Sequence, residues 1–187
     1  MRPLLINNGI LKDKMANNKH YETKRLELKP TDESDAQFVL ELMNTPKWHK
    51  FIGDRNVHSE DDAIAYIAEK MTPQFDRLGF GNYTVIRKSD GLKIGSCGLY
   101  DREGLEGVDI GFGFLPEYEK KGYALESALK IKELALNDFG LKTICAITSK
   151  ENIPSQKLLE KLGLNYIKPM KLPNSDEEIM FYQIEKS

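Results

Sequence analysis

The stretch VDIGFGFLPEYEKKGYALESA, residues 108–128, decides how the rest of the chain is interpreted. Its apolar first half predicts a strand over residues 109–115, which Pro116 ends. The polar segment 119–122 then leads into an amphipathic helix that begins near Tyr123. The first N–H groups of a helix have no partner within the helix, and the helix dipole adds partial positive charge beside them. A strand that turns into a helix in this way is typical of an anion-binding site.

Two lysines, Lys120 and Lys121, occupy this turn, although acidic residues are preferred at a helix start. A phosphate bound at the turn would explain them. The alternative is that they are solvated loop residues, with Glu117 and Glu119 as ordinary residues of a first helical turn. The chain contains no G-x-x-x-x-G-K-[ST] motif, and its G-F-G, residues 111–113, lies inside the strand and not at its exit. A phosphate at this turn would therefore use neither a Walker loop nor a dinucleotide fingerprint.

The composition indicates one domain that is not specialised for nucleic acid or membranes. The chain has 187 residues and a formal net charge of −2, so it is long enough for a sizeable core and lacks a basic surplus. No apolar run approaches the roughly 20 residues of a membrane-spanning helix, and the N-terminal apolar run is too short for a signal peptide. We expect a cytoplasmic protein in which Cys97 and Cys145 are buried reduced thiols. The histidines and cysteines have no metal-ligand spacing, so no metal is expected.

The pattern of apolar residues, caps and breakers predicts an alternation of strands and helices. Residues 1–21 are polar and without periodicity, so we expect a loosely ordered extension, with Met15 as an alternative start and residues 22–187 as the domain. The expected elements of the domain are a strand over 23–30, a helix capped by Thr31 or Asp32, a loop over 44–58, a helix opened by the capping box Ser59–Asp62 that buries Ala63, Ile64, Ile67, Ala68 and Met71, strands over 80–87, 92–100 and 108–115, a helix from Tyr123 to Gly140, a strand over 143–148, a helix from Asn152 to Gly163, and strands over 164–170 and 178–184.

The lengths of the connections predict the topology. Short turns join the three central strands, so these strands should form an antiparallel meander. The helix that follows residue 122 is a crossover, and it allows the next strand to run parallel to the one before. The chain is therefore expected to fold as a single α/β domain with a mixed sheet.

Three passages, in this order and spacing, resemble the GCN5-related N-acetyltransferases (GNAT), and more narrowly their RimJ/RimL-type branch, which acetylates ribosomal proteins. They are ETKRLELKPTDESDA, DIGFGFLPEYEKKGYALESA and ENIPSQKLLEKLGL, and the resemblance covers roughly residues 22–185. It implies a mostly antiparallel twisted sheet with helices on both faces and a splayed central strand pair. It also implies acetyl transfer from acetyl-CoA to a primary amine by direct attack in a ternary complex.

The phosphate turn departs from the pattern of the superfamily in two places. Glu119 stands where Gln or Arg is usual, and Lys120 stands where glycine is frequent. Glycine would allow a left-handed or close backbone geometry there, so Lys120 brings charge at the cost of a tighter approach.

The resemblance assigns the coenzyme to the turn and to the strand before it. The backbone N–H groups that would hold the pyrophosphate, helped by the lysine charges, belong to Glu119, Lys120, Lys121, Gly122, Tyr123 and Ala124. The exposed backbone edge near Phe112 and Phe114 would pair with the pantetheine amides, and an N–H there could stabilise the thioester oxyanion. The side chains of these two phenylalanines are expected to pack in the core.

Three residues have an implied role in chemistry or coenzyme contact, each beside a simpler alternative. By resemblance Asn152 contacts the coenzyme and Ser155 lies near its sulfur as a donor or acid, while helix capping accounts for either residue without a ligand. Asp109 could accept a proton from the attacking ammonium, or it could be an ordinary carboxylate at a strand end. The tyrosine acid of many members would fall near Leu159, and Tyr166 is a candidate substitute or a core aromatic.

The acceptor is left open. Trp48 and His49 lie in the region that borders the acceptor pocket in this family, and a tryptophan there either anchors a ligand or covers the core. A protein N-terminus, such as that of a ribosomal protein, and a small-molecule amine both fit, as do a monomer and a homodimer. The alternative function is a catalytically silent acyl-CoA-binding regulatory module, which would bind CoA without turnover.

Overall fold

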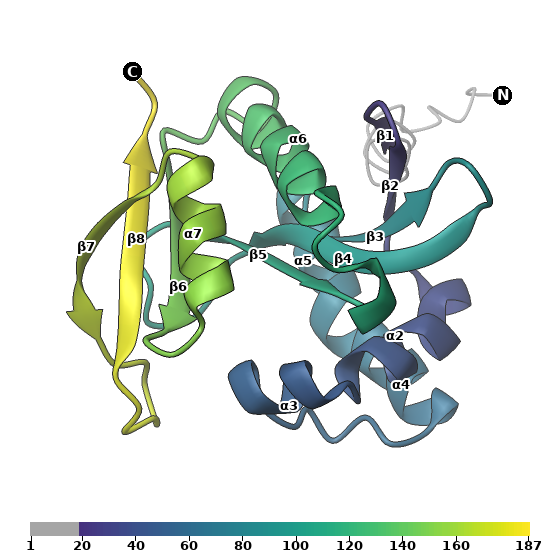
Figure 1. The fold of residues 1–187 in the computed structure, drawn as a ribbon. Coiled ribbons are helices and arrows are strands. Elements are labelled where there is room, and N and C mark those ends of the chain that lie inside the picture. The colour runs from purple at the N-terminus through teal and green to yellow at the C-terminus, as the bar shows by residue number, and fades with distance from the viewer. Residues whose placement is uncertain (1–18) are drawn as a thin grey trace, which may run out of the picture.

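The computed structural model describes residues 19–187, which form one α/β domain around an eight-stranded sheet (Figure 1). The order of the strands across the sheet is β1-β2-β3-β4-β5-β6-β8-β7. The strands are β1 (Tyr21–Glu22), β2 (Leu26–Pro30), β3 (Asn82–Arg87), β4 (Leu92–Tyr100), β5 (Val108–Phe114), β6 (Thr143–Ser149), β7 (Asn165–Met170) and β8 (Ile179–Glu185). The helices are α2 (Ala36–Met43), α3 (Pro46–Phe51), α4 (Glu60–Tyr66), α5 (Thr72–Leu78), α6 (Tyr123–Asn137) and α7 (Ile153–Lys161).

The topology confirms the predicted meander and crossover. Strands β3, β4 and β5 pair antiparallel in sequence, and β6 follows α6 and pairs parallel to β5. The remaining pairs are antiparallel, with β8 inserted between β6 and β7. The sheet is therefore mixed and mostly antiparallel, as expected.

Helices cover both faces of the sheet, and each face has its own apolar cluster (Figure 1). The larger cluster lies under α6, where Ala128, Ile131 and Ala135 are fully buried against strand residues. The smaller cluster joins α2 and α4 to the end of β5, and it includes Leu42, Ala63 and Leu115. Cys97 and Cys145 are buried and unbonded, as the sequence predicted.

The prediction of a loop over 44–58 is wrong in part, because α3 lies within it. Thr45 caps this helix by accepting a hydrogen bond from the N–H of Trp48, and Pro46 occupies its first turn. The helix has only six residues and buries none of them fully, so it lacks the apolar periodicity that reveals longer helices.

The helix that Ser59 opens is interrupted, and its predicted buried face is wrong at Ala68, which is exposed. A π-helical turn over Ile67–Met71 separates α4 from α5. Pro73 explains the interruption, since proline has no N–H for the helical ladder and its ring crowds the carbonyl of residue 69. The extra residue per turn rotates the later side chains, so that Phe75 becomes buried instead.

One residue of the expected extension, Tyr21, belongs to the first strand of the sheet. Tyr21 pairs with Leu28 in β1, and its ring packs edge-on against Tyr83 and Phe139. The rest of the expected extension, including Met15, lies outside the described residues.

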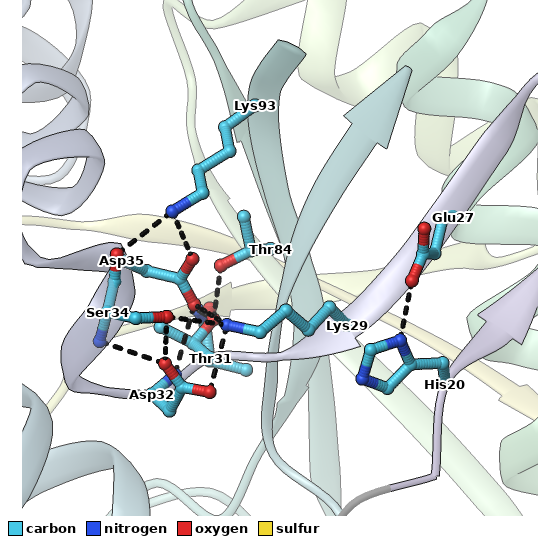
Figure 2. A network of polar contacts seen from close by, with 10 residues as sticks. His20, Glu27, Lys29, Thr31, Asp32, Ser34, Asp35, Thr84 and Lys93 are labelled. Atoms are coloured by element: carbon cyan, nitrogen blue, oxygen red, sulfur yellow. Dashed lines mark hydrogen bonds and ion pairs between the residues drawn. The ribbon is translucent and has the colours of Figure 1, made fainter. Parts of the chain in front are cut away.

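A network of charged groups holds the start of α2 against the sheet (Figure 2). Asp35 is fully buried, and its carboxylate lies 2.8 Å from Lys29 Nζ and 2.7 Å from Lys93 Nζ. Its Oδ2 also accepts the backbone N–H of Asp32, which caps the turn as predicted. Burial by itself would raise the pKa of Asp35, but the hydrogen bonds from the two lysines and the Asp32 N–H outweigh it and hold the pKa below its usual value.

The Asp35→Asn variant should therefore lose stability near pH 7 and little at low pH. Because the pKa of Asp35 is lowered in the folded state, its contribution is present above the unfolded pKa and disappears as the pH falls through the folded pKa. Removing one partner of a buried ion pair costs about 3 kcal/mol. Thermal unfolding measured across pH checks this, with Glu41→Gln, an exposed change on α2, as the control. A loss of stability that does not depend on pH would contradict the ionic role.

Candidate active site

Strands β5 and β6 separate after two residue pairs, and this opens the centre of the sheet. Only Val108 with Ile144 and Asp109 with Cys145 are paired between them. Beyond Asp109, β5 continues for five residues alongside β4, while β6 continues alongside β8. Figure 1 shows the two strands running apart from their common start. The splayed strand pair is therefore present, and "the cleft" below denotes the region where the backbones of β5 and β6 diverge and no longer pair with each other.

The register of β5 determines which backbone groups face the cleft. The N–H of Leu115 donates to Ile94 C=O at 3.0 Å, so this pair is hydrogen-bonded. Such pairs recur at every second residue of an antiparallel ladder, so the odd-numbered residues of β5 bond to β4. The N–H and C=O groups of Phe112 and Phe114 therefore point to the cleft, where no described strand pairs with them. Their side chains pack in the larger apolar cluster, as predicted.

Strand β6, which diverges from β5, ends in two hydroxyl groups without hydrogen-bond partners among the described residues. Thr148 and Ser149, the last two residues of β6, each have a buried side-chain oxygen without a hydrogen-bond partner among the described residues. The chain then enters α7, whose cap is Asn152, with Oδ1 accepting the N–H of Ser155 at 3.3 Å. The predicted capping is therefore observed, and it leaves the Ser155 hydroxyl without a described partner.

The turn between β5 and α6 has the backbone shape that glycines usually provide. Gly122, the residue before α6, has φ 81°, and Lys120 has φ 59°. Both values lie in the left-handed region, which lysine seldom adopts. The backbone N–H groups of residues 120–123 donate to no other described residue. The turn thus offers unpaired donors at the N-terminus of a 15-residue helix.

One arginine fixes this turn to the edge of the sheet. Arg25 donates from Nη1 to Lys121 C=O at 3.0 Å and from Nε to Glu126 at 2.7 Å, and its guanidinium lies 4.4 Å from the ring centroid of Tyr123. Glu126 also accepts from the hydroxyl of Thr23 at 2.6 Å. The first turn of α6 is therefore held to the connection between β1 and β2.

Glu119 is neutralised by a residue that the sequence did not reveal. Its carboxylate forms an ion pair with Lys47 of α3, 72 positions earlier in the chain. The pair joins α3 to the turn, and it cancels a negative charge that would repel a bound phosphate. Lys120 and Lys121 remain exposed, and the Lys121 ammonium lies 5.7 Å from the ring centroid of Tyr118.

Asp109 lies where the two strands begin to separate, and it is no ordinary carboxylate at a strand end. It is 2% exposed, and Oδ1 is buried without a hydrogen-bond partner among the described residues. Arg102 Nε lies 3.4 Å from Oδ2. Burial raises the pKa of Asp109 to about 6, and the charge of Arg102 opposes this increase only in part.

The two glycines of β5 provide flat backbone for two aromatic rings on the face opposite α6. A Cβ atom at Gly111 would lie 2.8 Å from Tyr100 Cε2, and one at Gly113 would lie 3.1 Å from Trp48 Cζ3. The indole Nε1 of Trp48 is buried without a hydrogen-bond partner among the described residues. Trp48 therefore reaches the strand that borders the cleft. His49 is exposed on α3 and lines no described cavity.

A cavity of about 70 Å³ lies on the same face beside Tyr100. The π-helical turn contributes Lys70 and Met71 to it, and such turns often mark functional sites. On the sheet side, Asn82 Oδ1 accepts from the hydroxyls of Tyr100 and Ser96. The remaining lining residues are Tyr66, Gln74 and Gly81. None of these lining residues was predicted as part of a site, because the packing of the helical segment α4–α5 against β3 and β4 brings them together. Tyr166 is neither buried nor near the cleft: it lies on the edge strand β7, 47% exposed.

In the part of the chain that the structure describes, no group of acidic, histidine or cysteine residues could hold a metal ion. No helix of the described residues is long and apolar enough to span a membrane.

The chain matches the family model of the acetyltransferase (GNAT) domain over residues 25–165. It belongs to the GNAT family. A curated relative from Bacillus subtilis (strain 168), "Uncharacterized N-acetyltransferase YnaD", is 31% identical over 145 residues, which are 78% of this chain and 82% of the relative.

Solved structures agree on the fold. A GNAT-family acetyltransferase from Bacillus anthracis superposes with a TM-score of 0.74 at 24% identity, covering 89% of this chain and 98% of that one. The ribosomal-protein-S5-alanine acetyltransferase of Vibrio fischeri superposes with a TM-score of 0.72 at 15% identity, covering 89% and 96%. The chain is thus an acetyltransferase, and the superfamily and enzyme class predicted from the sequence are confirmed.

The contact between Gly113 and Trp48 can be tested by fluorescence, because Trp48 is the only tryptophan of the chain. In Gly113→Ala the new methyl group would lie 3.1 Å from the ring, so the indole must move outward and its emission should shift to longer wavelength. Gly111→Ala is the matched control, since its methyl group meets Tyr100 instead. An unchanged emission spectrum in Gly113→Ala would show that the indole does not rest on the strand.

Proposed function

We propose that the protein transfers an acetyl group from acetyl-CoA to a primary amine by direct attack in a ternary complex. The observation that carries this proposal is the divergence of β6 from β5, which leaves backbone N–H and C=O groups of β5 unpaired on the side that faces β6. Members of the GNAT family generally take their acetyl group from acetyl-CoA. We assign the same donor to this chain.

The residues around the cleft fit this donor. The backbone groups of Phe112 and Phe114 would pair with the two amides of the pantetheine arm as an added strand does. The free N–H groups of residues 120–123, with Lys120 and Lys121, would hold the pyrophosphate. At the end of β6 and the start of α7, the unpartnered hydroxyls of Thr148 and Ser149 and the side-chain amide of Asn152 are further hydrogen-bonding groups. Unpaired buried polar groups are costly, and a bound ligand would satisfy them.

Acetyl-CoA supplies an activated thioester, and two side chains of the protein would move the protons. Asp109 would accept a proton at Oδ1 from the acceptor ammonium, since this oxygen has no other described partner. The Ser155 hydroxyl would give a proton to the departing thiolate and regain one from the nitrogen of the tetrahedral intermediate, which thereby becomes the amide nitrogen. A backbone N–H of β5 at the cleft would stabilise the oxyanion.

For the acceptor, we propose an amine that enters from the face opposite α6, over Gly111 and Gly113, with its remainder directed toward the cavity beside Tyr100. Trp48 would border this path. The RimJ/RimL-type resemblance and the similarity in fold to a ribosomal-protein-S5-alanine acetyltransferase support a protein N-terminus as the acceptor. Small amines remain the second class to test.

The direct experiment measures release of free thiol from acetyl-CoA with a panel of N-terminal peptides and small amines. Thermal stabilisation by CoA is measured in parallel. Turnover with at least one amine, together with stabilisation by CoA, supports the proposal. Stabilisation without turnover across the whole panel would favour the silent acyl-CoA-binding module, and no stabilisation at millimolar CoA would contradict both.

Asp109→Asn should remove the acidic limb of the pH profile. In the parent, kcat/KM should fall as the pH drops through about 6, because Asp109 accepts a proton only when it is ionised. The variant should lose about 10²-fold in kcat and show no such limb. Asp109→Asn should lower activity but raise stability relative to the parent at neutral pH, since a buried carboxylate with a raised pKa destabilises the fold once it is ionised.

The melting temperature of Asp109→Asn relative to the parent should therefore increase as the pH is raised from about 4 to about 8. An unchanged acidic limb in the variant would assign the base to another group.

Ser155→Ala should lower kcat by about 10²-fold and leave the KM for acetyl-CoA almost unchanged. The substitution keeps the backbone N–H that Asn152 caps, so α7 should remain folded. Lys157→Ala, an exposed change on the same helix, is the control. Equal kcat values in Ser155→Ala and the parent would mean that Ser155 serves only the helix start.

A further inference from the structure

A pocket of about 210 Å³ lies beside the phosphate turn, on the edge of the sheet away from β6. Two cations come from the connection between β1 and β2, Lys24 and Arg25, and two come from the end of β3, Arg87 and Lys88. Ser89 and Tyr123, the first residue of α6, complete its lining. We call this the basic pocket.

The positive charge of the basic pocket is only partly neutralised. Arg25, Arg87 and Lys88 form ion pairs with Glu126, Asp90 and Glu22, respectively. Lys24 has no ion-pair or hydrogen-bond partner among the described residues, and neither has the hydroxyl of Ser89. The pocket therefore retains a net positive charge, and the Lys24 ammonium and the Ser89 hydroxyl are available to a ligand.

Side chains that line the basic pocket also contact the phosphate turn or a ring beside it. Arg25 lines the pocket and also donates to Lys121 C=O in the turn. Arg87 lines the pocket, and its guanidinium lies 4.9 Å from the ring centroid of Tyr118, the ring that Lys121 approaches from the turn. An anion that extends beyond the turn in this direction enters a region of positive charge.

We propose that the basic pocket binds a phosphate monoester, the 3′-phosphate on the ribose of coenzyme A. This inference rests on the proposed function, because it assumes that the pyrophosphate of the same nucleotide lies at the turn. A phosphate monoester carries close to two negative charges at pH 7 and presents three acceptor oxygens. Lysine, arginine and serine are suitable donors to such a group. The pocket thus selects coenzyme A over its 3′-dephospho form.

Isothermal titration calorimetry with CoA and with 3′-dephospho-CoA tests the proposal without turnover. The parent should bind CoA about tenfold or more tightly than 3′-dephospho-CoA. The variant Lys24→Ala/Ser89→Ala removes the two groups without a described partner, so the fold should be retained. It should lose most of the preference by weakening CoA binding, with 3′-dephospho-CoA binding unchanged. Lys171→Ala, an exposed lysine near the end of β7, is the control and should keep the parent's preference.

The outcomes separate this inference from the proposed function. Equal affinity of the parent for CoA and 3′-dephospho-CoA overturns the pocket assignment and leaves the acetyltransferase proposal intact. Failure of both to bind contradicts both proposals. Inorganic phosphate is titrated separately: if it stabilises the parent but not the variant, while the two coenzymes bind equally, the pocket takes free phosphate and the assignment to coenzyme A is wrong.

Discussion

The separation of β5 from β6 after Asp109 is the constraint on which the candidate site depends. The two halves of the sheet share only two residue pairs, so sheet hydrogen bonds contribute little to their relative position. Helix α6 fixes the relative position of the two halves instead, because Ile131 and Ala135 pack in the same apolar cluster as Ile144 of β6 and Ile110 of β5. Burial of apolar surface is not directional, so it can hold two strands together while their backbones diverge.

The phosphate turn has two residues in the left-handed region, Lys120 and Gly122, although one of them is a lysine. Lys120 adopts the left-handed conformation that glycine would adopt freely, at a cost of about 1 kcal/mol. The contacts of Arg25 with Lys121 C=O and Glu126 are in place to offset this strain. The charge of Glu119 is cancelled by Lys47. The effect of Lys120 and Glu119 on the turn therefore depends on the contacts that Arg25 and Lys47 make there.

The sequence was sufficient where a signal is local. An apolar run ended by Pro116 predicted a strand over 109–115, which the structure has at Val108–Phe114, and the helix after Gly122 and the cap at Asn152 followed from residues within a few positions. The sequence did not predict contacts between residues that are far apart along the chain. The ion pair from Lys47 to Glu119 and the packing of Tyr100 on Gly111 depend on the tertiary fold. The π-helical turn had a local signal in Pro73, but its effect on which face is buried required the neighbouring helices.

The alternation Gly-Phe-Gly-Phe over residues 111–114 explains how one strand can serve the core and the site together. Successive side chains point to opposite faces, so Phe112 and Phe114 enter the core under α6 while Gly111 and Gly113 leave backbone bare on the other face. The hydrogen-bonding edge between these faces is open to the cleft. In the proposed reaction the donor would use the edge and the acceptor would use the glycine face. The two would then meet at the same strand without competing for space, which is the condition for direct transfer between them.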